Sequence, residues 1–91
     1  MPRYLIERAL PGAGTLTPAE LQGIAQKSNE VLSGMGGRAH WLESYVTDDA
    51  ITCVYVADSP ESLREHAELG GFPVTQIRQI GSVIDAGTAD A

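Results

Sequence analysis

Residues 40–68, HWLESYVTDDAITCVYVADSPESLREHAE, contain the elements that decide the fold. Two runs rich in aromatic and β-branched residues, 40–47 and 51–57, are typical of β-strands, and the short polar link between them predicts a hairpin. A helix should follow, because Ser59 is a good N-cap and Pro60 suits the first helical position. The stretch therefore predicts strand, turn, strand and helix in succession.

The rest of the chain supplies two further strands and one further helix. Residues 3–8, RYLIER, predict a strand, and the extended run from Pro73 to Ile84 predicts the last one. Thr17 and Glu20 have the spacing of a capping box that begins a helix. Apolar residues continue this helix at helical spacing: Leu21, Ile24, Ala25, Val31, Leu32 and Met35. The order βαββαβ predicts a ferredoxin-like α+β fold, a four-stranded antiparallel sheet with two helices on one face.

Composition limits the classes of function. The chain has 91 residues and a net charge of −6, with twelve acidic and six basic residues, which argues against nucleic-acid binding. No apolar run is long enough to span a membrane, and the N-terminus lacks the layout of a signal peptide, so we expect a cytoplasmic protein. The single Cys53 excludes an intramolecular disulfide. We expect one domain over residues 1–85, a flexible tail over 86–91, and a partner subunit, because so short a chain buries a modest core.

Side chains alternate between the two faces of a strand, which divides the hairpin residues into two sets. Thr52, Val54 and Val56 form the more aliphatic set, so we assign them to the core beneath the helices. The opposite face then carries Trp41, Glu43, Tyr45, Cys53 and Tyr55. An aromatic face of this kind usually marks an interface or a ligand groove. We therefore expect a homodimer that joins sheet to sheet, as in a dimeric α/β barrel, and encloses a cavity.

Four residues of this face are candidate ligand-binding residues: Trp41, Glu43, Tyr45 and Tyr55. Interface packing is the simpler explanation for the aromatic ones, because aromatic residues are enriched at both kinds of surface. If Ile6 lies in the core, Glu7 points into the same cavity. The sequence contains no nucleophile with its base in a recognisable context, so no catalytic residue is predicted.

Several segments resemble a family of small bacterial ferredoxin-like proteins, largely uncharacterised, that includes a nickel-responsive, nickel-binding dimer. The segments are MPRYLIER, WLESYVTDD and TCVYVADSPESLREHAELGGFPV. The most specific pattern is W-x-x-S-Y-V, then C-V-Y, S-x-E-x-x-R-x-H-A and G-x-P. The residues that match it are Trp41, Ser44, Tyr45, Val46, Cys53, Val54, Tyr55, Ser59, Glu61, Arg64, His66, Ala67, Gly71 and Pro73.

The resemblance implies a homodimer of ferredoxin-like subunits and nickel binding, without a settled activity. Nickel accepts imidazole, thiolate and carboxylate ligands, so His66, Cys53 and Glu7 are the natural candidates in this chain. A structural histidine is an equally good interpretation of His66, which lies beside the buried stripe of its helix. Cys53 as a small buried hydrophobic residue is the simpler interpretation.

The leading interpretation is a small cytoplasmic, metal-binding, nickel-responsive homodimer. The alternative is a small dimeric α/β-barrel enzyme, similar to monooxygenases or cyclases, that acts on an aromatic or polyketide-like substrate. A third possibility is an interaction module without a ligand.

Overall fold

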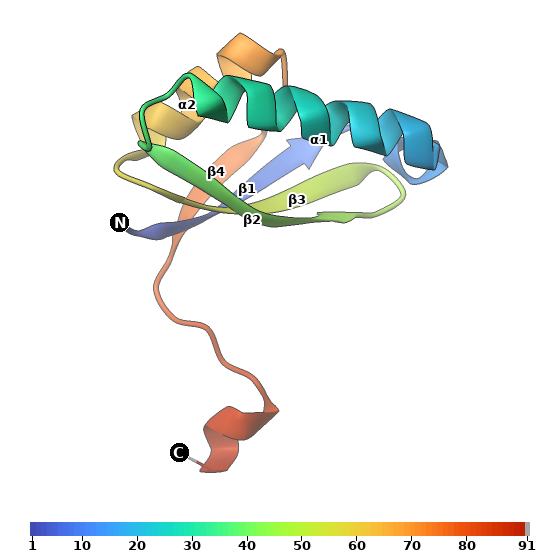
Figure 1. Ribbon diagram of the computed structural model, residues 1–91. Coiled ribbons are helices and arrows are strands. Elements are labelled where there is room, and N and C mark those ends of the chain that lie inside the picture. The colour runs from blue at the N-terminus through green and yellow to red at the C-terminus, as the bar shows by residue number, and fades with distance from the viewer. Residues whose placement is uncertain (91) are drawn as a thin grey trace.

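The computed structural model describes residues 1–90, in which strands and helices follow the predicted order (Figure 1). The strands are β1 (Arg3–Ala9), β2 (Ala39–Val46), β3 (Ala50–Ala57) and β4 (Gln76–Ile80). The helices are α1 (Pro18–Ser33) and α2 (Pro60–Gly70), with short 3-10 helices η1 (Ala13–Thr15) and η2 (Ala86–Asp90). No helix among these residues is long and apolar enough to cross a membrane.

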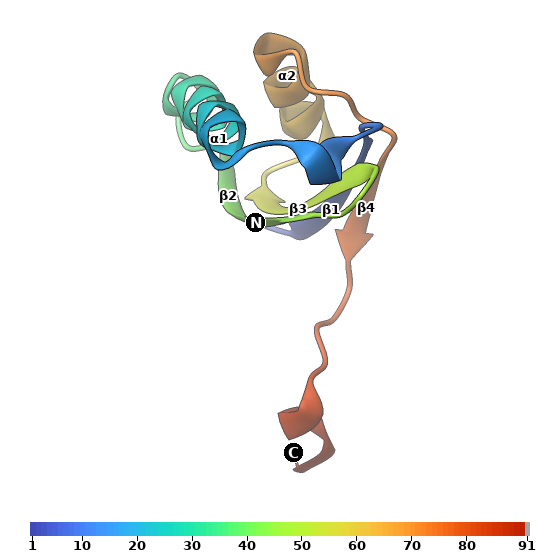
Figure 2. The ribbon, with the colours of Figure 1, turned by 90° about the vertical axis from the view of Figure 1, so that its right-hand side faces the viewer.

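The four strands form one antiparallel sheet in the order β2-β3-β1-β4. Both helices cover the same side of this sheet, as the two views in Figures 1 and 2 show. We call the covered side the inner face and the other side the open face. The order of elements and the two-layer arrangement confirm the predicted ferredoxin-like α+β fold.

The first helix begins where its capping box predicts. The Thr17 hydroxyl accepts a hydrogen bond from the Glu20 backbone N–H (3.1 Å), and the Glu20 carboxylate accepts one from the Thr17 N–H (2.9 Å). These bonds satisfy two of the backbone donors that a helix start leaves free, and they lower the pKa of Glu20. The local sequence is therefore enough to fix this end of α1.

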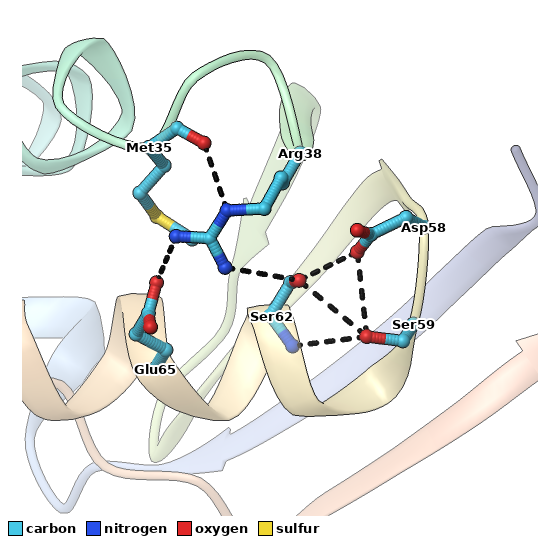
Figure 3. A network of polar contacts seen from close by, with 6 residues as sticks. All are labelled: Met35, Arg38, Asp58, Ser59, Ser62 and Glu65. Carbon is cyan, nitrogen blue, oxygen red and sulfur yellow. Dashed lines mark hydrogen bonds and ion pairs between the residues drawn. The ribbon is translucent and has the colours of Figure 1, made fainter.

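A polar network fixes the start of α2 against the segment that follows α1 (Figure 3). Arg38 donates to the Met35 carbonyl (3.0 Å) and to the Ser62 hydroxyl (3.5 Å), and it pairs with Glu65. Ser62 in turn donates to the Asp58 carboxylate, a bond that lowers the pKa of Asp58. The network joins the two helices at one end, although the exposed ion pair itself contributes little stability.

The core lies between the inner face and the two helices. Its strand residues are Tyr4, Ile6, Ile51, Cys53, Tyr55 and Ala57. Ile6 and Leu63 are fully buried, the first from β1 and the second from α2. Ile6 thus belongs to the core, which is the condition under which Glu7 was expected on the other face, and Glu7 lies on the open face.

The predicted faces of β3 are reversed in the structure. Cys53 and Tyr55 are only 4% and 2% exposed and lie on the inner face, whereas Thr52 and Val54 are half-buried on the open face. The aliphatic criterion failed because the Tyr55 hydroxyl has a hydrogen-bond partner, Ser28 of α1, on the inner face.

A β-bulge in β2 divides the residues that were assigned to one face. Trp41 pairs with Tyr55 on the inner face, but the register shifts between Trp41 and Glu43, so that Glu43 pairs with Val54 on the open face. Because the extra residue, Leu42, reverses the alternation, Trp41 and Glu43 point to opposite sides. The predicted open-face position is thus correct for Glu43 and Tyr45 and wrong for Trp41.

The last strand is shorter than predicted. β4 covers Gln76–Ile80 and ends before Gly81, whereas the prediction extended from Pro73 to Ile84. Beyond it the chain leaves the body on the side of the open face and ends in η2 (Figures 1 and 2). Flexibility of residues 86–91 stays a prediction, and Ala91 lies outside the described residues.

Replacement of Thr17 by alanine should destabilise the fold through the lost cap of α1. The expected cost is about 1 kcal/mol in the free energy of unfolding, measured by urea denaturation. Ser33→Ala, at the other end of the same helix, is the matched control and should cost less. Equal losses in the two variants would contradict a special role for the capping box.

Candidate functional site

Polar side chains gather at two places, and Arg8 belongs to both. One is an inner polar cluster, defined by Arg8, Ser28, Cys53, Tyr55 and His66, between the sheet and the helices. The other is a hollow on the open face that includes Glu7. Each place combines residues from elements far apart in the sequence, so either could bind a small partner.

The centre of the inner polar cluster is a hydrogen-bonded chain of three side chains. The Ser28 hydroxyl of α1 lies 3.2 Å from the Tyr55 hydroxyl of β3 and 3.2 Å from Nε2 of His66 on α2. Ser28 is the one buried residue of α1, and His66 is fully buried. The polar group in the middle of α1 therefore joins both helices to the sheet.

Aromatic rings surround this chain of hydrogen bonds. Tyr55 stacks on Trp41 with ring centroids 6.4 Å apart, and its other neighbour is the His66 ring at 5.3 Å. His66 in turn stacks on Phe72 at 5.4 Å. The four rings, contributed by β2, β3, α2 and the loop after α2, form a continuous row from the inner face of the sheet to α2 and its following loop.

Arg8 brings a positive charge into the cluster. It is 5% exposed and donates from Nε to Cys53 Sγ (3.4 Å) and from Nη1 to the Pro73 carbonyl (2.8 Å). Its guanidinium carbon lies 5.5 Å from the centre of the Phe72 ring, a cation–π distance. Nη2 is buried without a partner, as is Nδ1 of His66.

Burial sets the protonation of the two titratable groups at the centre. It lowers the pKa of His66, and the nearby Arg8 charge acts in the same direction, although the bond to Ser28 opposes them. Burial also raises the pKa of Tyr55. Both shifts favour the uncharged form, so near neutral pH the Arg8 guanidinium is the charged group that the cluster holds.

The hollow on the open face has a volume of about 250 Å³. Its lining consists of Glu7, Arg8, Ala9, Asp49, Ala50, Thr52 and Thr75. Hydrogen bonds hold its rim, because the Thr75 hydroxyl accepts from the Ala9 N–H (2.9 Å) and the Asp49 carboxylate accepts from the Gly12 N–H (3.0 Å). Two residues with carboxylates and two with hydroxyls thus line the hollow.

The predicted site residues separate between these two places. Of the three predicted metal ligands, Cys53 and His66 belong to the inner polar cluster, whereas Glu7 lines the hollow on the other side of the sheet. Among residues 1–90, His, Cys, Asp and Glu side chains form no group of three or more that could hold a metal ion.

The predicted ligand-binding residues also separate. Trp41 and Tyr55 stack on the inner face, whereas Tyr45 and Glu43 are exposed on the open face. Tyr45 pairs with Thr52, which also pairs with Glu7, so the three form a row across the strands. A hydrogen bond to the Glu43 carboxylate raises the pKa of Tyr45.

Sequence reasoning missed Arg8, Ser28 and Phe72. Two of them had a detectable signal: Arg8 alternates with Tyr4 and Ile6 along β1, and Ser28 falls on the apolar stripe of α1. A charged or polar residue at an inward position is the pattern that indicates a buried polar site.

Comparison with known proteins agrees with this architecture. The fold places the chain in the class of small ferredoxin-like α+β domains. A family model described as nickel responsive protein SCO4226-like matches residues 4–80. The chain therefore belongs to the SCO4226-like family. No curated protein matches the chain significantly.

A solved structure shares the fold. It is the crystal structure of SCO4226 from Streptomyces coelicolor A3(2), with a TM-score of 0.76 over 90% of this chain and 99% of that one. The sequences are 15% identical, so this likeness supports the fold alone.

The free energy of unfolding should decrease as the pH is lowered, because His66 titrates. The histidine of the unfolded chain titrates near the unperturbed pKa of 6.5, whereas the folded chain resists protonation to a lower pH. Between these values the unfolded chain binds more protons, so the free energy of unfolding decreases by up to about 1.4 kcal/mol per pH unit as pH falls. Below the folded pKa the dependence from this residue ends.

Urea unfolding at a series of pH values from about 7 to about 5 measures this slope. His66→Gln should reduce it, whereas His40→Gln, at an exposed position of β2, should leave it nearly unchanged. A slope that persists in the His66 variant would show that other groups carry the pH dependence.

Proposed function

We propose that this chain forms a cytoplasmic homodimer that binds nickel between the open faces of its subunits. Membership of a family described as nickel responsive carries the proposal, together with the carboxylate-lined hollow on the open face. The open face supplies both requirements, a surface for a second subunit and oxygen ligands for a cation.

The case for a dimer rests on the composition of the open face. Leu5 and Val54 pair at its centre, and Val56 and Ile80 lie one row further along, on either side of Arg3. Charged groups lie beside this apolar pair, Glu43 next to Val54 and Arg78 next to Leu5. An apolar centre with a polar rim is the usual anatomy of a protein interface.

The case for a metal at the hollow rests on ligand chemistry. Nickel accepts carboxylate as well as imidazole ligands, and Glu7 and Asp49 line the same hollow. Sheet-to-sheet association would bring the Glu7 residues of two subunits to the same interface. Of the three ligands predicted from sequence, Glu7 is therefore the one that we place in the nickel site.

Electrostatics disfavours the other two predicted ligands. Cys53 accepts a hydrogen bond from Arg8, and the charge of Arg8 already acts on His66. A metal cation at Cys53 and His66 would lie close to a buried guanidinium, where like charges repel strongly because little solvent screens them. The inner polar cluster is thus the poorer nickel site.

A charge in the centre of the open face should dissociate the dimer. Val54→Asp would bury an unpaired carboxylate in the interface, and sedimentation velocity should show a shift towards monomer. Leu69→Asp, at a position of α2 that is 61% exposed, is the control and should stay dimeric. A monomeric unmodified protein at about 10 μM would refute the dimer.

Nickel affinity should depend on Glu7 and not on the inner polar cluster. Calorimetric titration of the untagged protein should show binding that Glu7→Gln weakens by about tenfold or more, equivalent to about 1.4 kcal/mol. Cys53→Ser and His66→Gln should keep the affinity of the unmodified protein. The reverse pattern would place the metal in the inner polar cluster, and no binding by the unmodified protein would refute the metal function.

A further inference from the structure

Arg8 is a buried cation without a counter-charge. It is 5% exposed, and among residues 1–90 no carboxylate lies within ion-pair distance of it. The chain has a net charge of −6, so acidic side chains are abundant elsewhere. Burial of an unpaired charge is costly, and buried charges in proteins are normally paired. The inner polar cluster therefore holds a positive charge that no side chain among residues 1–90 neutralises.

Two unsatisfied polar atoms in the same cluster support this interpretation. Nη2 of Arg8 and Nδ1 of His66 are both buried without a hydrogen-bond partner. Both side chains contact the Phe72 ring, the guanidinium at 5.5 Å and the imidazole at 5.4 Å. Nη2 is always a donor, and the hydrogen bonds of the cluster allow Nδ1 of His66 to be one as well.

The hydrogen-bonded chain can make both unsatisfied atoms donors at once. If the Tyr55 hydroxyl donates to Ser28 and the Ser28 hydroxyl donates to Nε2 of His66, the neutral imidazole carries its proton on Nδ1. An acceptor oxygen beside Nδ1 of His66 would favour this direction of the hydrogen bonds from Tyr55 to Ser28 to His66. The neutral imidazole, favoured by burial, is then a hydrogen-bond donor beside the positive guanidinium.

We propose that the inner polar cluster binds a small oxyanion, such as a carboxylate or phosphate group, through Arg8 Nη2 with His66 Nδ1 as a second donor. The guanidinium fork suits planar carboxylates and phosphate oxygens. This proposal goes beyond nickel binding and does not depend on it, because its donor atoms, Arg8 Nη2 and His66 Nδ1, are not the carboxylates of Glu7 and Asp49 that would hold nickel.

The loop after α2 provides the route to solvent. Phe72 is half-buried and its ring contacts both Arg8 and His66, so it covers the two side chains that carry the unsatisfied nitrogens. A Cβ at Gly70 would lie 2.3 Å from the Phe72 ring, and Gly71 has a positive φ of 71°. Both glycines are therefore needed to place the ring over the cluster, where its displacement would admit an anion.

The experiment measures whether anions bind and whether Arg8 is required. Acetate and phosphate are titrated separately into the full chain at fixed ionic strength, with chloride as the balancing anion. The readouts are the ¹⁵N shift of His66 Nδ1 and the melting temperature. We expect a saturable shift with a Kd of about 1–10 mM for at least one oxyanion, and a melting temperature that rises with its concentration.

Arg8→Met decides between binding and a purely structural role. Methionine fills similar space without charge, so this variant should keep or increase its stability in chloride and lose the oxyanion-dependent rise. Arg78→Met, which removes an exposed guanidinium, should respond like the unmodified protein. If Arg8→Met does not fold, Arg8→Lys replaces it, with an expected loss of affinity of about tenfold through the missing fork.

Three results would overturn the proposal. The first is that the unmodified protein shows no saturable response to either anion. The second is that the Arg8→Met and Arg78→Met variants respond equally. The third is that the Arg8→Lys variant binds the anion as tightly as the unmodified protein. A response to acetate alone would identify a carboxylate site, and a response to phosphate alone an inorganic or phosphoryl site.

Discussion

The buried Tyr55 hydroxyl is the constraint on which the rest of the structure depends. Its ring lies on the inner face between Tyr4 of β1 and Trp41 of β2, and its hydroxyl meets Ser28 of α1. Because a buried hydroxyl must be hydrogen-bonded, this contact fixes which side of α1 faces the sheet. Ser28 then also bonds His66, so the orientation of α2 follows from the same interaction.

Element types and helix starts were predictable because they depend on local chemistry. Thr17 and Ser59 cap helices where the sequence places them, since a cap needs its own side chain and the next few backbone donors. The faces of β3 were not predictable in this way. Val54 is more apolar than Tyr55, yet Tyr55 is buried, because its hydroxyl has a partner that belongs to a distant helix.

The candidate site could be predicted only in part for the same reason. Glu7 lies on the open face, as expected once Ile6 is in the core, and Glu43 is there too. Because of the bulge at Leu42, Trp41 lies on the inner face. The residue types at this position do not predict a bulge. Arg8 was missed since a charged residue on a strand is assumed to be exposed unless its neighbours argue otherwise.

The two faces of the sheet make different demands on a small chain. If a second subunit covers the open face as proposed, Leu5 and Val54 are buried in the dimer, and the cost of exposing them falls on the monomer alone. The inner polar cluster has no such compensation, because Arg8 and His66 are buried within one subunit and each keeps an unsatisfied nitrogen. A 91-residue chain has little apolar core to offset these groups, and apolar residues of similar size would be as stable or more so. The cluster is therefore better explained by the binding of an anion than by the stability of the fold.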